Sequence, residues 1–261
     1  MEVPEIMNQN NMKNKIQFIT LFSLFSFLFF TNGINAQTDA TELLKKLDKT
    51  IFTIKDKTTN IKMVMVNQKT QKEKVKKAVM WQKGADMKLF RYTFPESDSG
   101  IATLSLPNDE IYMYLPLFKK PKKITNLAES NAFNKSDFSV KDMATKPYIE
   151  TFTGKLLSTN DTAHVVDLTP KSDDISFSHI VVYINKTHFY PSRFDFYDNK
   201  NQLVKIATYQ YIKISGYWVS NIAAMENLKK KSKTTIYMSG IKINQGLKDE
   251  LFTVENLAGG S

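Results

Sequence analysis

Between Thr59 and Asn244, short apolar and aromatic runs show a period of two, and turn residues separate the runs. This period places successive side chains on opposite faces of a β-strand. About a dozen such runs occur against two or three helical segments, and an antiparallel sheet of that size curls into a barrel or half-barrel. The sequence therefore predicts a mainly β fold. We expect strands over Ile61–Val66, Val75–Trp81, Met87–Phe94, Ile101–Leu106, Ile111–Leu115, Ile149–Ser158, His164–Leu168, Phe177–Ile184, Arg193–Tyr197, Val204–Ile214, Tyr217–Asn227 and Thr234–Asn244.

One amphipathic helix is expected ahead of these strands, over Thr38–Ile51. Leu43, Leu44 and Leu47 share one face of it at three- and four-residue spacing. At the other end of the chain, Gly246–Phe252 is expected to form a turn or a short helix.

A polar stretch, Asn126–Pro147, interrupts the strands and contains three isolated apolar residues, Phe133, Phe138 and Met143. Within it, Ser139-Val-Lys-Asp142 fits a capping box for a short helix that must end before the proline. We expect this stretch to lie outside the sheet.

Several predicted strands are apolar on both faces. Ile180, Val182 and Ile184, for example, alternate with Val181 and Tyr183. Few helices are available to cover such a sheet, so a concave apolar face must be filled by a plugging helix or by a ligand.

The N-terminal residues have the three regions of a secretory signal peptide. Lysines follow Met12, the expected start, and precede the 15-residue apolar run Ile16–Phe30, which as a helix spans only about 22 Å. We therefore expect residues 1–36 to be a signal peptide cleaved after Ala36, with residues 37–261 as a single exported, soluble domain. An uncleaved N-terminal anchor is the alternative.

The chain contains no cysteine, so it has neither a disulfide nor a lipidation site at Gln37, and we expect a free periplasmic protein. The formal net charge is +10, and Arg91 and Arg193 are the only arginines. This charge favours an acidic partner or surface. Export and the lack of a recognised nucleic-acid module argue against nucleic acid.

Signals of catalysis are weak. The sequence has no His-Glu-x-x-His, no Gly-x-Ser-x-Gly and no glycine-rich phosphate loop. His164, His179 and His188 lack metal-ligand spacing and are expected to be structural or surface residues. We expect no metal and no cofactor. Helix caps and turns are the simpler explanation for the scattered carboxylates Asp137, Asp142, Asp195 and Asp198.

Methionine and aromatic residues are frequent in the predicted strands of the N-terminal half. Methionine adapts to irregular apolar partners, which suits a cavity for flexible acyl chains, although ordinary core packing explains the same composition. The candidates for a cavity lining are Met63, Met65, Trp81, Phe90, Tyr92, Phe94, Leu104, Tyr112 and Tyr114, not all of which can face inward.

Two lysine-rich hairpin ends are candidates for docking to an acidic partner or a headgroup layer, with solvated turns as the alternative. The first contains Lys119, Lys120, Lys122 and Lys123, and the second is Lys229–Lys233.

The stretch from Arg91 to Met143 resembles the LolA-like family of outer-membrane lipoprotein-sorting and periplasmic lipid-carrier proteins. The late segment Gly246–Phe252 is similar to the C-terminal segment of that family, whereas the strand-forming sequence after Tyr148 is longer than is usual there. The matching motifs are Phe94-Pro95, Ser99-Gly100-Ile-Ala-Thr-Leu104, Tyr112-Met-Tyr-Leu-Pro116 with the basic run that follows, Phe133, Ser136-Asp137-Phe138 and Asp142-Met143.

The resemblance implies an unclosed antiparallel barrel, here of 11 to 12 strands, with a plugging helix, a helical lid, an apolar cavity and no catalysis. It implies a periplasmic carrier of lipoprotein or lipid cargo that meets an inner-membrane donor and an outer-membrane acceptor, and we expect a monomer. The helix residues Leu43, Leu44 and Leu47 and the lid residues Phe133, Phe138 and Met143 would then fill the empty cavity. The alternatives are a periplasmic sensor or regulatory module on the same scaffold, and an enzyme with acid and base residues in the cavity.

Overall fold

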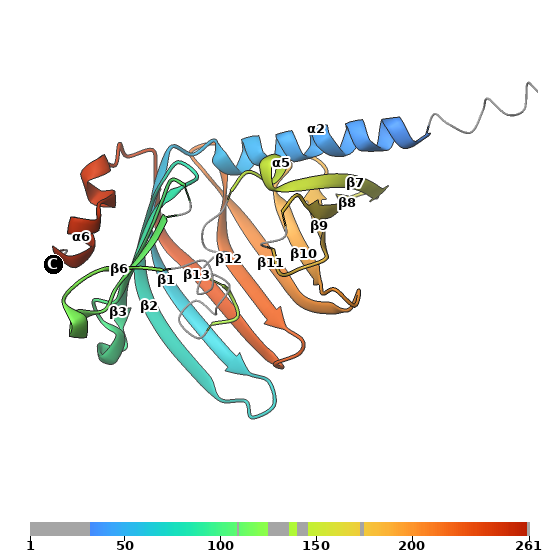
Figure 1. Cartoon of the computed structure of the whole chain (residues 1–261). Helices are drawn as coiled ribbons and strands as arrows, with labels where there is room; N and C mark the ends of the chain where they lie inside the picture. The colour runs from blue at the N-terminus through green and yellow to red at the C-terminus, as the bar shows by residue number, and fades with distance from the viewer. Residues whose placement is uncertain (1–31, 109, 125–135, 140–145, 173–174, 260–261) are drawn as a thin grey trace, which may run out of the picture.

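The computed structural model describes residues 32–108, 110–124, 136–139, 146–172 and 175–259. It contains one antiparallel sheet of 13 strands that curls but does not close (Figure 1). The mainly β fold class and the unclosed barrel are thus confirmed. The strands are β1 (Asp56–Asn67), β2 (Glu73–Lys83), β3 (Met87–Phe94), β4 (Ala102–Leu106), β5 (Glu110–Tyr114), β6 (Lys122–Lys123), β7 (Phe152–Thr159), β8 (Ala163–Pro170), β9 (His179–Asn185), β10 (Pro191–Tyr197), β11 (Leu203–Ile214), β12 (Tyr217–Asn227) and β13 (Ser232–Ile243).

The strand order is two meanders joined by one long-range pairing. Strands β1 and β13 pair at the centre of the strand order. From this pair, β2 to β6 follow in sequence toward one edge of the sheet, and β12 to β7 follow toward the other edge. The edge strand β6 is the one that the sequence pattern did not predict. It has only two residues, both lysines, which is a common way to protect a sheet edge from further pairing.

Within the described residues, three α-helices and three 3₁₀ turns accompany the sheet. The predicted plugging helix is α2 (Asn32–Phe52), which begins six residues earlier than expected and lies along one end of the curled sheet, over β7 (Figure 1). The predicted signal peptide lies outside the described residues up to position 31. Among the helices that are described, none has the length and apolarity needed to span a membrane. The other helical elements are α5 (Tyr148–Thr151), α6 (Val254–Gly259), η1 (Glu96–Asp98), η2 (Pro116–Phe118) and η4 (Asp249–Phe252).

The expected strand start at Ile149 is wrong, because Tyr148–Thr151 is the helical turn α5 and β7 begins at Phe152. The cause is a tertiary contact. The Asp48 carboxylate on α2 accepts the backbone N–H groups of Tyr148 at 2.8 Å and Ile149 at 2.9 Å. It thereby caps the first N–H groups of α5, which have no partner within the helix.

The close approach of α2 to β7 requires a glycine. A Cβ atom at Gly154 would lie 3.1 Å from Leu44 Cδ1 and 3.4 Å from Ala40 Cβ. The helix therefore packs directly on the strand backbone, and Leu44 and Leu47 are fully buried.

The sheet has an inner face, which packs against α2, and an outer face. Inner-face side chains from both meanders form one large apolar cluster with α2. On the outer face, the C-terminal residues Phe252 and Leu257 cover a smaller cluster around Leu89, Ala102 and Leu104. The predicted turn or short helix at Gly246–Phe252 is confirmed in part by η4, and the chain continues into α6.

Candidate functional site

The inner face of the sheet is apolar over most of its width. Met63 on β1 lies opposite Ile236 on β13, and Met80 on β2 lies opposite Phe90 on β3. All four side chains are buried in the cluster that includes α2. This face is the candidate site.

The structure divides the nine predicted lining residues between the two faces. Met63, Met65, Phe90 and Tyr92 belong to the inner cluster. Trp81, Leu104, Tyr112 and Tyr114 belong to the outer cluster under the C-terminal segment, and Phe94 is 45% exposed at a strand end. The lining proposal is therefore kept for the four inner residues.

The predicted helix and lid residues lie on the inner face wherever they are described. Leu43, Leu44 and Leu47 on α2 and Phe138 are buried in the inner cluster. Phe133 and Met143 lie outside the described residues, as does most of the predicted Ser139–Asp142 helix.

Asp137 fastens the Ser136–Phe138 segment to the inner face. Its carboxylate accepts the hydroxyl protons of Ser232 at 2.5 Å and Thr234 at 2.8 Å, and its backbone N–H donates to Thr234 Oγ1 at 3.0 Å. The sequence pattern predicts a cap or turn role for this aspartate instead. The available signal was the Ser-x-Thr spacing on β13, which places both hydroxyls on one face of the strand.

Replacing Asp137 with alanine should release this segment. Charge-assisted hydrogen bonds contribute about 1.5–3 kcal/mol each, so we expect hydrogen exchange in the peptide containing Ser136–Phe138 to become at least about tenfold faster. Ser136→Ala is the matched control, because the Ser136 hydroxyl donates to Phe138 O within the same segment. Unchanged protection in Asp137→Ala would show that Asp137 is not the anchor.

A cavity of about 660 Å³ lies between Asp137 and the far ends of β1 and β2. Strand β1 starts close to the end of α2. At about 3.3 Å per residue, the last residue of β1, Asn67, lies about 35 Å from the first residue of the strand. The cavity is thus at the end of the sheet opposite the β1 start. Its lining combines apolar, hydroxyl and charged residues, namely Met65, Val66, Asn67, Thr70, Lys72, Lys74, Val75, Lys76, Pro95, Ser97, Asp98, Ser136, Asp137, Lys230, Ser232 and Thr234.

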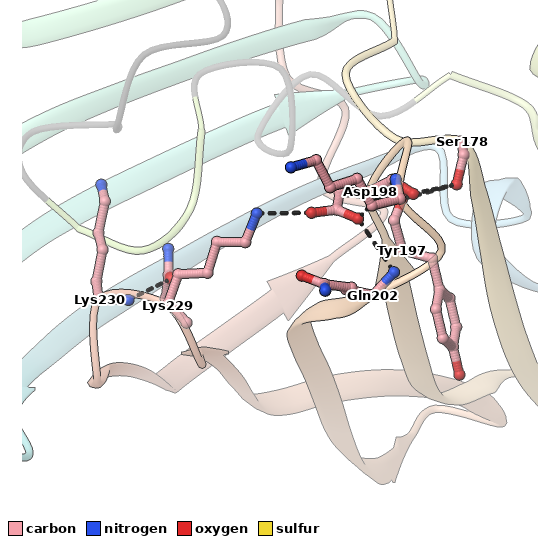
Figure 2. Close-up of polar contacts among 8 residues, drawn as sticks. Ser178, Tyr197, Asp198, Gln202, Lys229 and Lys230 are labelled. Carbon is pink, nitrogen blue, oxygen red and sulfur yellow. Dashed lines mark hydrogen bonds and ion pairs between the residues drawn. The ribbon is translucent and has the colours of Figure 1, made fainter.

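Two turns beside this cavity are held together by an ion pair. Lys229 Nζ on the β12–β13 turn lies 2.6 Å from Asp198 Oδ2 on the β10–β11 turn (Figure 2). Asp198 Oδ1 also accepts the backbone N–H groups of Lys200 and Gln202. The hydrogen bond from Lys229, with these backbone bonds, lowers the pKa of Asp198 to about 2, so this carboxylate is ionised at neutral pH.

Three other buried carboxylates position the backbone or pair with a charged side chain. Asp48 caps α5, Asp56 accepts three consecutive backbone N–H groups, and Asp195 pairs with Arg193 at 2.7 Å. Burial is the main cause that raises the pKa of Asp48. The three histidines stack on aromatic rings: His164 on Phe189, His179 on Tyr197 and His188 against Trp218. Within the described ranges, no group of three or more potential metal ligands occurs.

The first lysine-rich turn also carries exposed apolar side chains, which the sequence pattern does not predict. Leu117 and Phe118, in η2, are 85% and 54% exposed. Lys122 Nζ lies 4.9 Å from the centroid of the Phe118 ring, and Lys119, in a left-handed conformation, ends η2. The turn therefore presents two apolar side chains beside four lysines.

Residues 84–259 match a family model described only as an uncharacterized protein. A comparison with curated proteins finds no match. The family match covers more than half of the chain, including the inner-face strands from β3 onward and the C-terminal cover of the outer face.

Three solved structures are similar to this one over nearly their entire length. A domain named for outer membrane lipoprotein sorting from Vibrio parahaemolyticus has 23% identity and a TM-score of 0.78, covering 85% of this chain and 99% of its own. A DUF1329 family protein from Desulfovibrio piger has 22% identity and a TM-score of 0.78, with the same coverages. A LolA superfamily protein from Nitrosomonas europaea has 21% identity and a TM-score of 0.69, covering 82% of this chain and 97% of its own.

Proposed function

Because this chain belongs to the family of uncharacterized proteins that matches residues 84–259 and has the fold of a LolA superfamily protein, we propose that it is a periplasmic carrier of acyl chains. It shields the acyl chains of lipids or lipoproteins against the inner face of the sheet during transport toward the outer membrane. The observation that carries this proposal is the large apolar cluster on the inner face, which includes side chains of α2 and Phe138.

The energetics of such a carrier follow from an exchange of apolar contacts. Burial of one CH₂ group contributes about 0.8 kcal/mol, so a 16-carbon chain contributes about 12 kcal/mol before losses. Leu43, Leu47 and Phe138 occupy the same face without cargo and contribute about 1.5–3 kcal/mol each. Cargo affinity is then the difference between the two sets of contacts, which permits both loading and release.

Native mass spectrometry and lipid extraction of protein purified from the periplasm test this function. We expect a reproducible bound species that contains acyl chains. After this species has been removed, we expect the protein to take up added lipid or lipopeptide. An empty protein that takes up neither would contradict the carrier. An empty protein in stable complex with another protein would favour a sensor or regulatory module instead.

Export and transfer partners are part of the same proposal. Cleavage after Ala36 would free residues 37–261 as one domain that acts as a monomer between an inner-membrane donor complex and an outer-membrane acceptor. Sequencing the N-terminus of the periplasmic protein tests this directly. An N-terminus at Gln37 is expected, whereas retention of the apolar run Ile16–Phe30 would indicate an anchor.

We propose further that the lysine-rich turn around Leu117 docks on an anionic membrane surface. Lys119, Lys120 and Lys122 provide the charge, whereas Lys123 is paired with Glu110 at 2.5 Å. Insertion of Leu117 and Phe118 adds apolar burial. In the double variant Leu117→Asp/Phe118→Asp, we expect co-sedimentation with vesicles of phosphatidylcholine and phosphatidylglycerol to fall at least about fivefold, since each side chain contributes more than about 1 kcal/mol.

The control for this docking experiment is Leu157→Asp on β7, because Leu157 is also half exposed but lies far along the sheet from the lysine-rich turn. Its vesicle binding should be unchanged, and higher salt should weaken the binding of the unmodified protein. Equal binding by the double variant and the unmodified protein would exclude this turn as the docking surface.

A further inference from the structure

The inner face changes from apolar to basic along its length. Lys74 and Lys76 on β2 lie opposite Met65 and Met63 on β1, in the register that places all four on the same face of the sheet. Lys72, two residues before Lys74, also lines the 660 Å³ cavity. Lys72, Lys74 and Lys76 thus line the cavity together with its apolar residues.

The cavity contains more positive than negative charge. Four lysines line it against two aspartates, Asp98 and Asp137. Asp98 Oδ2 is paired with Lys76 Nζ at 2.5 Å, and Asp137 is held by the hydroxyls of β13. In the described part of the chain, no carboxylate lies within ion-pair distance of Lys72, Lys74 or Lys230.

The β12–β13 turn keeps Lys230 apart from the neighbouring ion pair. Figure 2 shows Lys229 extended toward Asp198, whereas the Lys230 side chain points in a different direction. The Lys230 backbone N–H donates to Asn227 Oδ1 at 2.9 Å, which fixes the turn. Lys229 is thus neutralised by Asp198, whereas Lys230 lines the cavity.

We propose that this cavity binds the phosphate of an anionic phospholipid whose acyl chains lie on the adjacent inner face, with Lys72, Lys74 and Lys230 as its ligands. The inference rests on the proposed carrier function and names its cargo class. It favours a phospholipid over a lipoprotein, because the diacylglycerol group linked to a lipoprotein cysteine has no phosphate to meet these lysines.

The chemistry of the two regions matches the two parts of such a molecule. A phosphate accepts charge-assisted hydrogen bonds from several ammonium groups at once, and the net charge of +2 of the lining favours one anionic headgroup. Met65 lines the cavity and also packs against the inner apolar cluster, so a single ligand can contact both regions.

Binding of matched short-chain lipids tests the proposal. Calorimetry with dioctanoyl phosphatidylglycerol, dioctanoyl phosphatidylcholine and inorganic phosphate separates the charge of the headgroup from the acyl chains and from free phosphate. We expect phosphatidylglycerol to bind at least about tenfold more tightly than phosphatidylcholine. The triple variant Lys72→Gln/Lys74→Gln/Lys230→Gln should lose this preference and still bind phosphatidylcholine.

A control with the same change in net charge is Lys62→Gln/Lys213→Gln/Lys242→Gln, because these exposed lysines lie away from the cavity. It should retain the preference. Equal affinity for the two lipids in the unmodified protein, or a preference that survives in the cavity variant, would overturn the phosphate site. Binding of inorganic phosphate as tightly as phosphatidylglycerol would overturn the lipid as its source. Failure of both lipids to bind would contradict the carrier function itself.

Discussion

Asp56→Ala is expected to lower the free energy of unfolding by about 4 kcal/mol, a large part of the total stability of an ordinary domain. The Asp56 carboxylate is only 4% exposed and accepts the backbone N–H groups of Gln245 at 2.6 Å, Gly246 at 2.8 Å and Leu247 at 3.2 Å. These groups lie where the chain leaves β13 for the outer face. Each hydrogen bond to a charged group contributes about 1.5–3 kcal/mol, and part of the loss is recovered when the freed N–H groups reach water.

Urea denaturation followed by circular dichroism measures this effect. The control is Asp161→Ala, since Asp161 is exposed in the β7–β8 turn, and its change should stay within about 0.5 kcal/mol. The same Asp56→Ala variant should lose protection of the segment over the outer cluster, because Leu247 leads directly into η4 and α6. A change below about 1 kcal/mol would show that these hydrogen bonds do not hold the C-terminal segment.

Met238→Asp is expected to weaken acyl-chain binding at least about a hundredfold. Met238 on β13 lies opposite Ile61 on β1 and packs, half buried, against the inner cluster. An ionised carboxylate at this position must lose water when an acyl chain covers it, and this desolvation costs several kcal/mol. A hundredfold loss corresponds to about 2.7 kcal/mol.

The neighbouring residue provides the control for this prediction. Tyr237 is 43% exposed and faces outward on the same strand, so Tyr237→Asp introduces the same charge on the outer face. Displacement of a fluorescent fatty acid measures both variants, with unfolding curves recorded in parallel. Similar affinities for the two variants would mean that the inner face does not hold the acyl chain.

The period-two pattern of the sequence predicted twelve of the strands, and the three- and four-residue spacing of Leu43, Leu44 and Leu47 predicted the helix. Both signals are local, because the geometry of a strand or helix repeats within a few residues. The resemblance to LolA-like proteins also led to the correct fold.

The period-two pattern does not identify which face of each strand lies inside. Met80 and Trp81 are neighbours on β2 and both looked suited to a cavity lining, yet Met80 packs in the inner cluster and Trp81 in the outer one. Alternation fixes that two neighbours point in opposite directions. It does not identify the inner one when both faces are apolar, and here the C-terminal segment covers part of the outer face.

Taken by itself, the sequence determined the strands, the amphipathic helix and the basic, cysteine-free character of the chain, because each depends on residue type and local spacing. Only the tertiary structure decided that β1 pairs with β13, that Asp48 turns Tyr148–Thr151 into a helix, and that Asp137 binds to β13. Each of these contacts joins residues about 100 or more positions apart. They depend on how the whole sheet curls, which no short window of sequence encodes.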